Sequence, residues 1–154
     1  MTVISGLALP NGSGFSPDGT RFYLNEMMAS RILSFNFSAD NGQFSDRTAL
    51  AVIDPADGYP DGLCIDADGN LWTAMWQGSS LIKYSPEGEI LSRVKAPVPS
   101  PTCPAFAGRN YEDLYVTSAR KGLSEKQLHD FPKSGSTFIL KQAGTGLKVK
   151  PFAG

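Results

Sequence analysis

The stretch PNGSGFSPDG at residues 10–19 shares its plan with PDGLCIDADG at residues 60–69, and asparagine at position 11 becomes aspartate at position 61. In both copies a proline precedes a polar residue, a short apolar run follows, and an Asp-Gly pair ends the stretch. That order is typical of a strand that enters a hairpin turn, because glycine adopts positive φ at low cost. PTCPAF at residues 101–106 repeats the beginning of the pattern and leads to a looser turn at 108–110. The repeat therefore predicts three equivalent strands.

Each of these first strands is followed by three more apolar runs of strand length. The second strands are predicted at 21–24, 70–76 and 113–117, the third at 31–37, 80–84 and 136–140, and the fourth at 48–53, 90–95 and 147–152. Four strands per repeat, with a period of roughly 40 to 50 residues, are the sequence signature of a β-propeller. We therefore predict an all-β chain that forms a single partial propeller domain over 1–154, with blades at 11–53, 61–95 and 102–154. Residues 123–130 could form a helical turn, but a long loop is favoured.

Composition is consistent with one globular domain and argues against nucleic acid and membranes as partners. The chain has 154 residues, of which 41% are apolar and 19% charged, and its net charge is −1. This balance, without a basic run, excludes the usual electrostatic basis of nucleic-acid binding. No apolar stretch approaches the roughly 20 residues that span a bilayer, and the first residues lack a charged leader, so no membrane association and a cytoplasmic location are expected. Cys64 and Cys103 are expected to be free, buried thiols, with a disulfide as the less favoured alternative.

The polar residue after each proline is the candidate functional position. In a propeller the first strand of every blade lines the central channel, so Asn11, Asp61 and Thr102 should converge there. All three carry oxygen atoms, which hard cations such as Ca²⁺ and Mg²⁺ prefer, and Zn²⁺ or Mn²⁺ could also bind. The alternative is that Asn11 and Asp61 only cap turns at the strand entrance.

Several stretches together resemble the gluconolactonase family, which includes senescence marker protein, also called regucalcin. They are PNGSGFSPDGTRFYLNE, SRILSFNF, YPDGLCIDADGNLWTAMWQGSSLIKYSPEGEIL, PTCPAF, DLYVTSAR and GSTFIL. The resemblance covers nearly the whole chain and matches the carboxy-terminal half of family members. It implies a six-bladed propeller with one divalent cation in its channel, and Ca²⁺ is the cation expected first for this chain. It also implies hydrolysis of sugar lactones or related cyclic esters.

The resemblance also implies roles for two residues. Asn11 matches the asparagine that binds the metal, and Asp61 matches the metal-binding aspartate that is also the usual candidate for the catalytic base. The remaining metal ligand of the family, a glutamate, and the residues that hold the sugar come from preceding blades that this sequence lacks. Glu26 is not expected to substitute for that glutamate, because it should lie away from the entrance of the first strand.

The resulting hypothesis is a metal-dependent hydrolase of sugar lactones, present here as a carboxy-terminal half. The alternative is a non-catalytic metal-binding or structural propeller fragment. A homodimer that closes a six-blade ring is a further hypothesis, since three blades leave two faces uncovered. His129, the single histidine, is expected at the surface, which makes a Ser-His-Asp hydrolase improbable. Arg120 is expected in a structural ion pair, with an anionic substrate group as the alternative.

Overall fold

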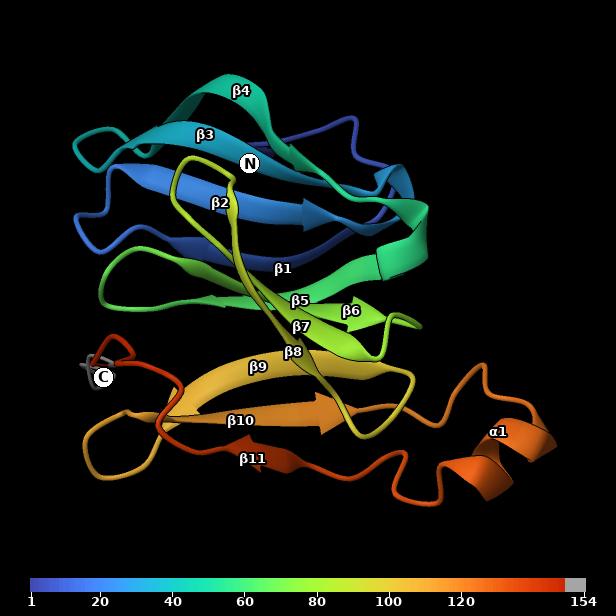
Figure 1. Cartoon of the computed structure of the whole chain (residues 1–154). Coiled ribbons are helices and arrows are strands. Elements are labelled where there is room, and N and C mark those ends of the chain that lie inside the picture. The colour runs from blue at the N-terminus through green and yellow to red at the C-terminus, as the bar shows by residue number, and fades with distance from the viewer. Residues whose placement is uncertain (149–154) are drawn as a thin grey trace.

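Short apolar and aromatic runs separated by glycine-containing turns form three antiparallel sheets in the computed structural model, which describes residues 1–148 (Figure 1). The first sheet has the order β1 (Pro10–Phe15), β2 (Arg21–Glu26), β3 (Arg31–Ser38) and β4 (Gln43–Val52). The second has the order β5 (Tyr59–Ile65), β6 (Leu71–Trp76), β7 (Ser80–Tyr84) and β8 (Ile90–Lys95). The third contains β9 (Pro101–Ala107), β10 (Asp113–Ser118) and β11 (Phe138–Leu140). Two 3₁₀ turns, Met27–Ala29 and Pro55–Asp57, complete the first half.

The three sheets follow one another along the molecule, and apolar side chains fill the spaces between them (Figure 1). Tyr23 and Ile32 of the first sheet pack with Leu63 and Leu71 of the second. Trp72 and Leu81 of the second sheet pack in the same way with Leu114 and Val116 of the third. The predicted all-β class is confirmed, because each sheet buries one face against its neighbour in the repeated manner that the sequence pattern indicates.

The predicted hairpin turns form, but two different carboxylates organise them. Asp18 accepts hydrogen bonds from the backbone N–H and the hydroxyl of Thr20, both at 3.0 Å. In the second turn the equivalent bonds go to Asp66, whose Oδ1 accepts from the backbone N–H of Asp68 at 3.1 Å and of Asn70 at 2.8 Å. Asp18 of the first Asp-Gly pair therefore organises its turn, whereas in the second repeat Asp66 does so in place of Asp68.

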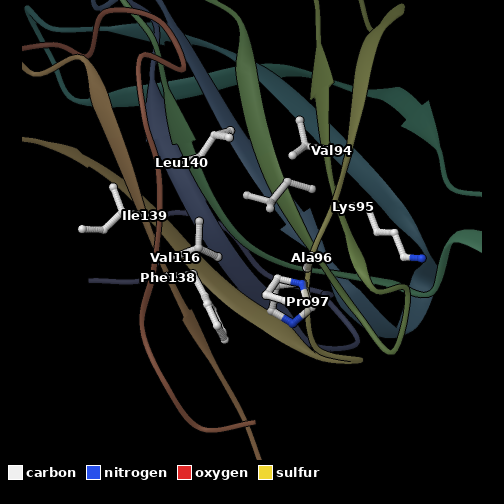
Figure 2. A pocket seen from close by; sticks show the side chains of 10 residues that line it. Val94, Lys95, Ala96, Pro97, Val116, Phe138, Ile139 and Leu140 are labelled. Carbon is white, nitrogen blue, oxygen red and sulfur yellow. The ribbon is translucent and has the colours of Figure 1, made fainter. Parts of the chain in front are cut away.

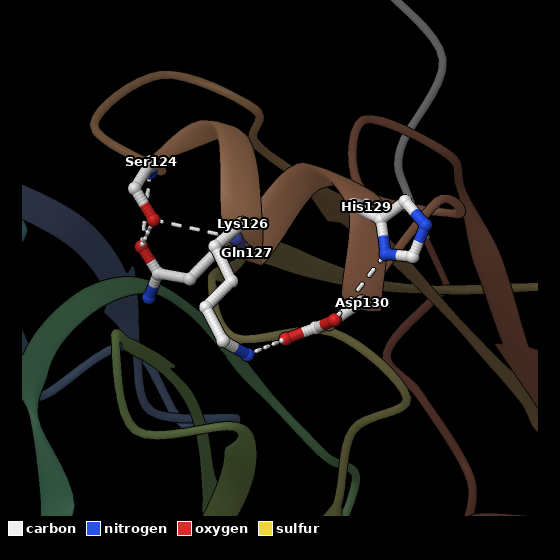
Figure 3. Close-up of polar contacts among 5 residues, drawn as sticks. All are labelled: Ser124, Lys126, Gln127, His129 and Asp130. Carbon is white, nitrogen blue, oxygen red and sulfur yellow. Dashed lines mark hydrogen bonds and ion pairs between the residues drawn. The ribbon is translucent and has the colours of Figure 1, made fainter.

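Residues 125–130 correct one prediction, because they form a helix, α1 (Glu125–Asp130), where a loop was favoured. A capping box starts the helix: the backbone N–H of Ser124 donates to Gln127 Oε1 at 3.0 Å, and Gln127 N donates to Ser124 Oγ at 3.3 Å (Figure 3). Lys126 and Asp130, four residues apart, add an ion pair. The capping box pairs two backbone N–H groups at the start of the helix, and local contacts of this kind favour a helix even over six residues.

Two further predictions concern the last strand and the two cysteines. The predicted fourth strand of the third repeat, 147–152, lies mostly outside the described residues. Cys64 and Cys103 are free thiols as expected, but neither is fully buried: Cys64 is partly buried and Cys103 is exposed. Burial raises the pKa of the Cys64 thiol to about 12. Within residues 1–148, no helix has the length and apolar character needed to cross a bilayer.

Candidate functional site

The first strands of the three sheets lie next to one another, with β5 in contact with both β1 and β9. Each first strand shifts its pairing register near its beginning: between Pro10 and Ser13 in β1, between Pro60 and Leu63 in β5, and opposite Val116 and Ser118 in β9. A register shift of this kind, as a β-bulge produces, bends the strand and redirects a side chain. The three shifts contain Asn11, Asp61 and Thr102, so the predicted positions occupy equivalent irregular sites on neighbouring strands.

Two glycines explain how these strands come so close. A Cβ atom on Gly12 would lie 2.1 Å from the backbone nitrogen of Leu63, and one on Gly62 would lie 2.5 Å from the carbonyl oxygen of Thr102. The glycine that follows Asn11 and the glycine that follows Asp61 therefore allow each strand to touch the next. Residue 103, at the same position of β9, is a cysteine.

Asp61 is a buried carboxylate with no cationic partner. The residue is 8% exposed, and no lysine, arginine or histidine among residues 1–148 forms an ion pair with it. Burial raises its pKa, and the side chain of Asn11 opposes that rise. Although Cys103 as a whole is exposed, partial desolvation of its sulfur and then the Asp61 charge raise the pKa of its thiol. A buried, uncompensated acid is a frequent mark of a functional position.

The other two buried carboxylates have partners. Glu26 accepts from the backbone N–H of Ala8 at 2.9 Å and from Arg31 Nε at 2.7 Å, with Arg47 3.6 Å away. Burial alone would raise the pKa of Glu26, but these contacts lower it below its ordinary value. Asp66 pairs with Lys83 at 2.9 Å, and its pKa is also lowered because this pairing and Asn70 outweigh burial. Their charges are balanced within the fold, which sets Asp61 apart.

The position of Glu26 also corrects the sequence analysis, which placed it away from the strand entrance. Glu26 ends β2 directly opposite Pro10, so it lies at the same end of the sheet as Asn11. The antiparallel hairpin requires this, because the last residue of β2 returns to the first residue of β1. Its carboxylate is nevertheless engaged by Ala8, Arg31 and Arg47.

The side-chain oxygen atoms of Asn11 and Thr102 differ in whether they already take part in hydrogen bonds. The amide nitrogen of Asn11 makes a long contact of 3.7 Å with the sulfur of Met27, and no hydrogen bond among the described residues uses its carbonyl oxygen. The hydroxyl of Thr102 is 2.7 Å from that of Thr117. A carboxylate and an amide oxygen are donors that hard cations accept, so Asn11 and Asp61 fit a divalent cation in donor chemistry. Residues 1–148 contain no group of three or more His, Cys, Asp or Glu side chains that could hold one alone.

Other candidates lie away from this cluster. The side chain of His129 is 90% exposed on α1, and its one polar contact within residues 1–148 is with Asp130, which confirms its surface position (Figure 3). Arg120 is exposed, and the ion pair expected for it does not form with any described residue. A cavity of about 190 Å³ between the second and third sheets is lined almost entirely by apolar side chains, with Lys95 the exception (Figure 2). It has no carboxylate in its lining and is not the site.

Sequence reasoning missed one residue beside Asp61. Asn25 of β2 is fully buried, and its Nδ2 donates to the backbone carbonyl oxygen of Asp61 at 2.7 Å. An asparagine at the end of the apolar run Phe22-Tyr23-Leu24 is the signal that could have drawn attention to it.

Consecutive antiparallel sheets whose first strands adjoin and carry polar residues at matched bulges define a protein of the β-propeller class. The family model described as "SMP-30/Gluconolactonase/LRE-like region" matches residues 1–120. The chain belongs to this SMP-30/gluconolactonase family.

Individual relatives agree with this assignment. L-arabinolactonase of Azospirillum brasilense is 37% identical over 147 residues, which are 96% of this chain and 48% of the relative. Human regucalcin is 36% identical over 146 residues, with 94% of this chain and 48% of regucalcin covered. The crystal structure of a calcium-binding protein, regucalcin, from Agrobacterium tumefaciens superposes with a TM-score of 0.86 at 30% identity, over 94% of this chain and 50% of that one. The chain thus spans about half the length of the relatives it matches.

Proposed function

We propose that this chain supplies Asn11 and Asp61 to the divalent-cation site of a sugar-lactone hydrolase. The observation that carries the proposal is the buried Asp61 carboxylate: within residues 1–148 it has no cationic partner, while the other two buried carboxylates have one. A bound cation would supply the missing positive charge and polarise a lactone carbonyl. Ca²⁺ is the proposed cation, because both donors are hard oxygen atoms; Mg²⁺, Mn²⁺ or Zn²⁺ are the alternatives to be tested.

In the proposed reaction, Asp61 acts as the general base. Its carboxylate would take a proton from a water molecule as the water oxygen bonds to the lactone carbonyl carbon. The ring C–O bond then breaks, and the departing ring oxygen takes the proton from Asp61, which yields an open hydroxy acid.

The proposal is tested by following acid release from aldonolactones and from L-arabinolactone, with Ca²⁺ or with a chelator. Ring opening that requires the cation supports it. Stable folding without turnover in any of the four cations would favour the alternative of a non-catalytic metal-binding or structural propeller fragment.

We expect Asn11→Ala to weaken cation binding about tenfold, and Asp61→Ala to weaken it about 100-fold or more, because affinity in oxygen sites follows the charge of the ligands. Calorimetric titration with Ca²⁺ of both variants and of the unchanged chain measures this order. Equal losses in the two variants would contradict the distinct roles given to the two residues.

We also propose that the three sheets are consecutive blades of a six-bladed ring, over 11–53, 61–95 and 102–154. Support comes from the relatives, which are about twice as long, and from the outer face of the first sheet, which the amino-terminal residues Ile4 and Leu7 cover only in part. That face carries five phenylalanines whose rings contact one another at centroid distances of 4.9 to 6.3 Å: Phe15, Phe22, Phe35, Phe37 and Phe44. In a closed ring another blade would cover them. The free thiols Cys64 and Cys103 support a cytoplasmic location, where thiols stay reduced.

For the isolated chain we expect a dimer in which a second copy covers the phenylalanine face and closes the ring. Two copies of Asn11 and Asp61 would then share one channel, so added Ca²⁺ should tighten the dimer. Light scattering measures the mass with and without Ca²⁺, and Phe15→Ser, on a residue that is 42% exposed, should shift the chain toward monomer. A well-behaved monomer of the unchanged chain at high concentration would contradict closure.

A further inference from the structure

Asn25 makes a hydrogen bond from the first sheet to the backbone of the second. It is the next-to-last residue of β2 and is 0% exposed, and its Nδ2 lies 2.7 Å from the carbonyl oxygen of Asp61. The oxygen of the same amide has no partner among the described atoms. Burying a polar group is unfavourable unless it is bonded, so this half-satisfied amide is retained in spite of its cost to the fold.

The bond acts on a peptide that the strand ladder leaves free. In β5, Pro60 pairs with Met75 and Leu63 with Thr73, while Asp61 and Gly62 have no paired residue on β6. The regular ladder therefore does not fix the orientation of the Asp61 peptide. Asn25, reaching across from the neighbouring sheet, provides the contact that does.

The equivalent positions of the other sheets lack this arrangement. The equivalent of Asn25 is Ala74 in the second sheet and Thr117 in the third. Each of the three residues comes directly after the residue of the second strand at which regular pairing with the first strand resumes. Ala74 has no polar side chain, so the second sheet cannot hold Thr102 in the same way. Thr117 is 3.4 Å from the carbonyl oxygen of Cys103 within its own sheet. Of the three entrance residues, Asp61 is the one held by an amide from the preceding sheet.

We propose that Asn25 is a positioning residue: its amide fixes the Asp61 peptide so that the carboxylate is held in one orientation toward the cation and the substrate. This inference rests on the proposed function. In this proposal Asn25 contacts neither the cation nor the substrate, and it acts through the backbone of Asp61.

The test uses Asn25→Leu, which keeps the branched shape of the side chain and removes both polar atoms. The chain is small enough for NMR, where scalar couplings report the side-chain rotamer of Asp61 and the carbonyl-carbon shift of Asp61 reports its hydrogen bond. We expect one rotamer in the unchanged chain, rotamer averaging and an upfield carbonyl shift in Asn25→Leu, and roughly tenfold weaker Ca²⁺ binding in that variant. Thr73→Val is the matched control, because Thr73 is equally buried and its hydroxyl is likewise unbonded among the described residues.

The outcomes separate this inference from the proposed function. A fixed Asp61 rotamer in Asn25→Leu overturns the inference whether or not Ca²⁺ binds. Rotamer averaging of Asp61 in Asn25→Leu but not in Thr73→Val supports the inference even if the chain on its own binds no Ca²⁺. Absence of Ca²⁺ binding would instead count against the proposed function. Averaging without any loss of measurable Ca²⁺ affinity overturns the positioning role.

Discussion

Asp61→Asn is expected to lower cation-dependent lactone hydrolysis by about 10²- to 10⁴-fold, the range typical of a lost general base. The substitution keeps the size of the side chain and removes both its charge and its ability to accept a proton. Initial rates at saturating Ca²⁺ measure the effect. Unchanged rates would remove Asp61 from the proposed mechanism.

The same substitution should leave the fold intact, because the Asp61 carboxylate has no ion-pair partner to lose among the described residues. We expect the free energy of unfolding to stay within about 1 kcal/mol or to increase. Asp66→Asn is the matched control, because it removes another buried carboxylate but leaves Lys83, 2.9 Å away, without its ion-pair partner. This variant should destabilise the fold by about 2 kcal/mol. Urea titrations of the two variants distinguish a functional carboxylate from a structural one.

Gly12→Ala should destabilise the chain by about 3 kcal/mol or more. The added methyl group would lie 2.1 Å from the backbone nitrogen of Leu63, and both strands are held in sheets, so neither can move aside without loss of packing. The φ angle of Gly12 is not positive, so the cost comes from the clash between β1 and β5 and not from backbone strain.

Gly42→Ala is the control for that variant. Gly42 has a φ of 68° and open space around it, so alanine there costs only the backbone term of about 1–2 kcal/mol. Chemical denaturation should therefore rank Gly12→Ala well below Gly42→Ala in stability. The opposite order would contradict the close packing of the first strands, on which the meeting of Asn11 and Asp61 depends.

Local sequence chemistry predicted most of the strands because it determines them. The Asp-Gly turns and the alternation of apolar residues fix hairpins within a repeat, and the repeat itself indicates that Pro10, Pro60 and Pro101 occupy equivalent positions. The helix at 125–130 was missed because six residues give too short a period to separate helix from loop. Its capping box, Ser124 with Gln127, was present in the sequence and was the stronger signal.

The site was predictable only in part. Asn11 and Asp61 could be selected because the repeat aligned them and the family resemblance gave them roles. The isolation of the Asp61 charge could not be predicted, since it depends on Lys83 pairing with Asp66 and on Arg31 pairing with Glu26. The contact from Asn25 to Asp61 joins residues 36 positions apart on different sheets, and no local pattern encodes the distance between sheets.

The central claim is that Asn11 and Asp61 together form part of one cation site, and paramagnetic broadening by Mn²⁺ tests it most directly. Mn²⁺ broadens NMR signals near its binding position even at low occupancy, so weak binding by the isolated chain suffices. At substoichiometric Mn²⁺ we predict selective loss of the amide signals of residues 11–12 and 61–62, reversal by excess Ca²⁺, and no such loss in Asp61→Asn. Broadening centred on the exposed turn acids Asp18 and Asp68, or equal broadening in Asp61→Asn, would contradict the account.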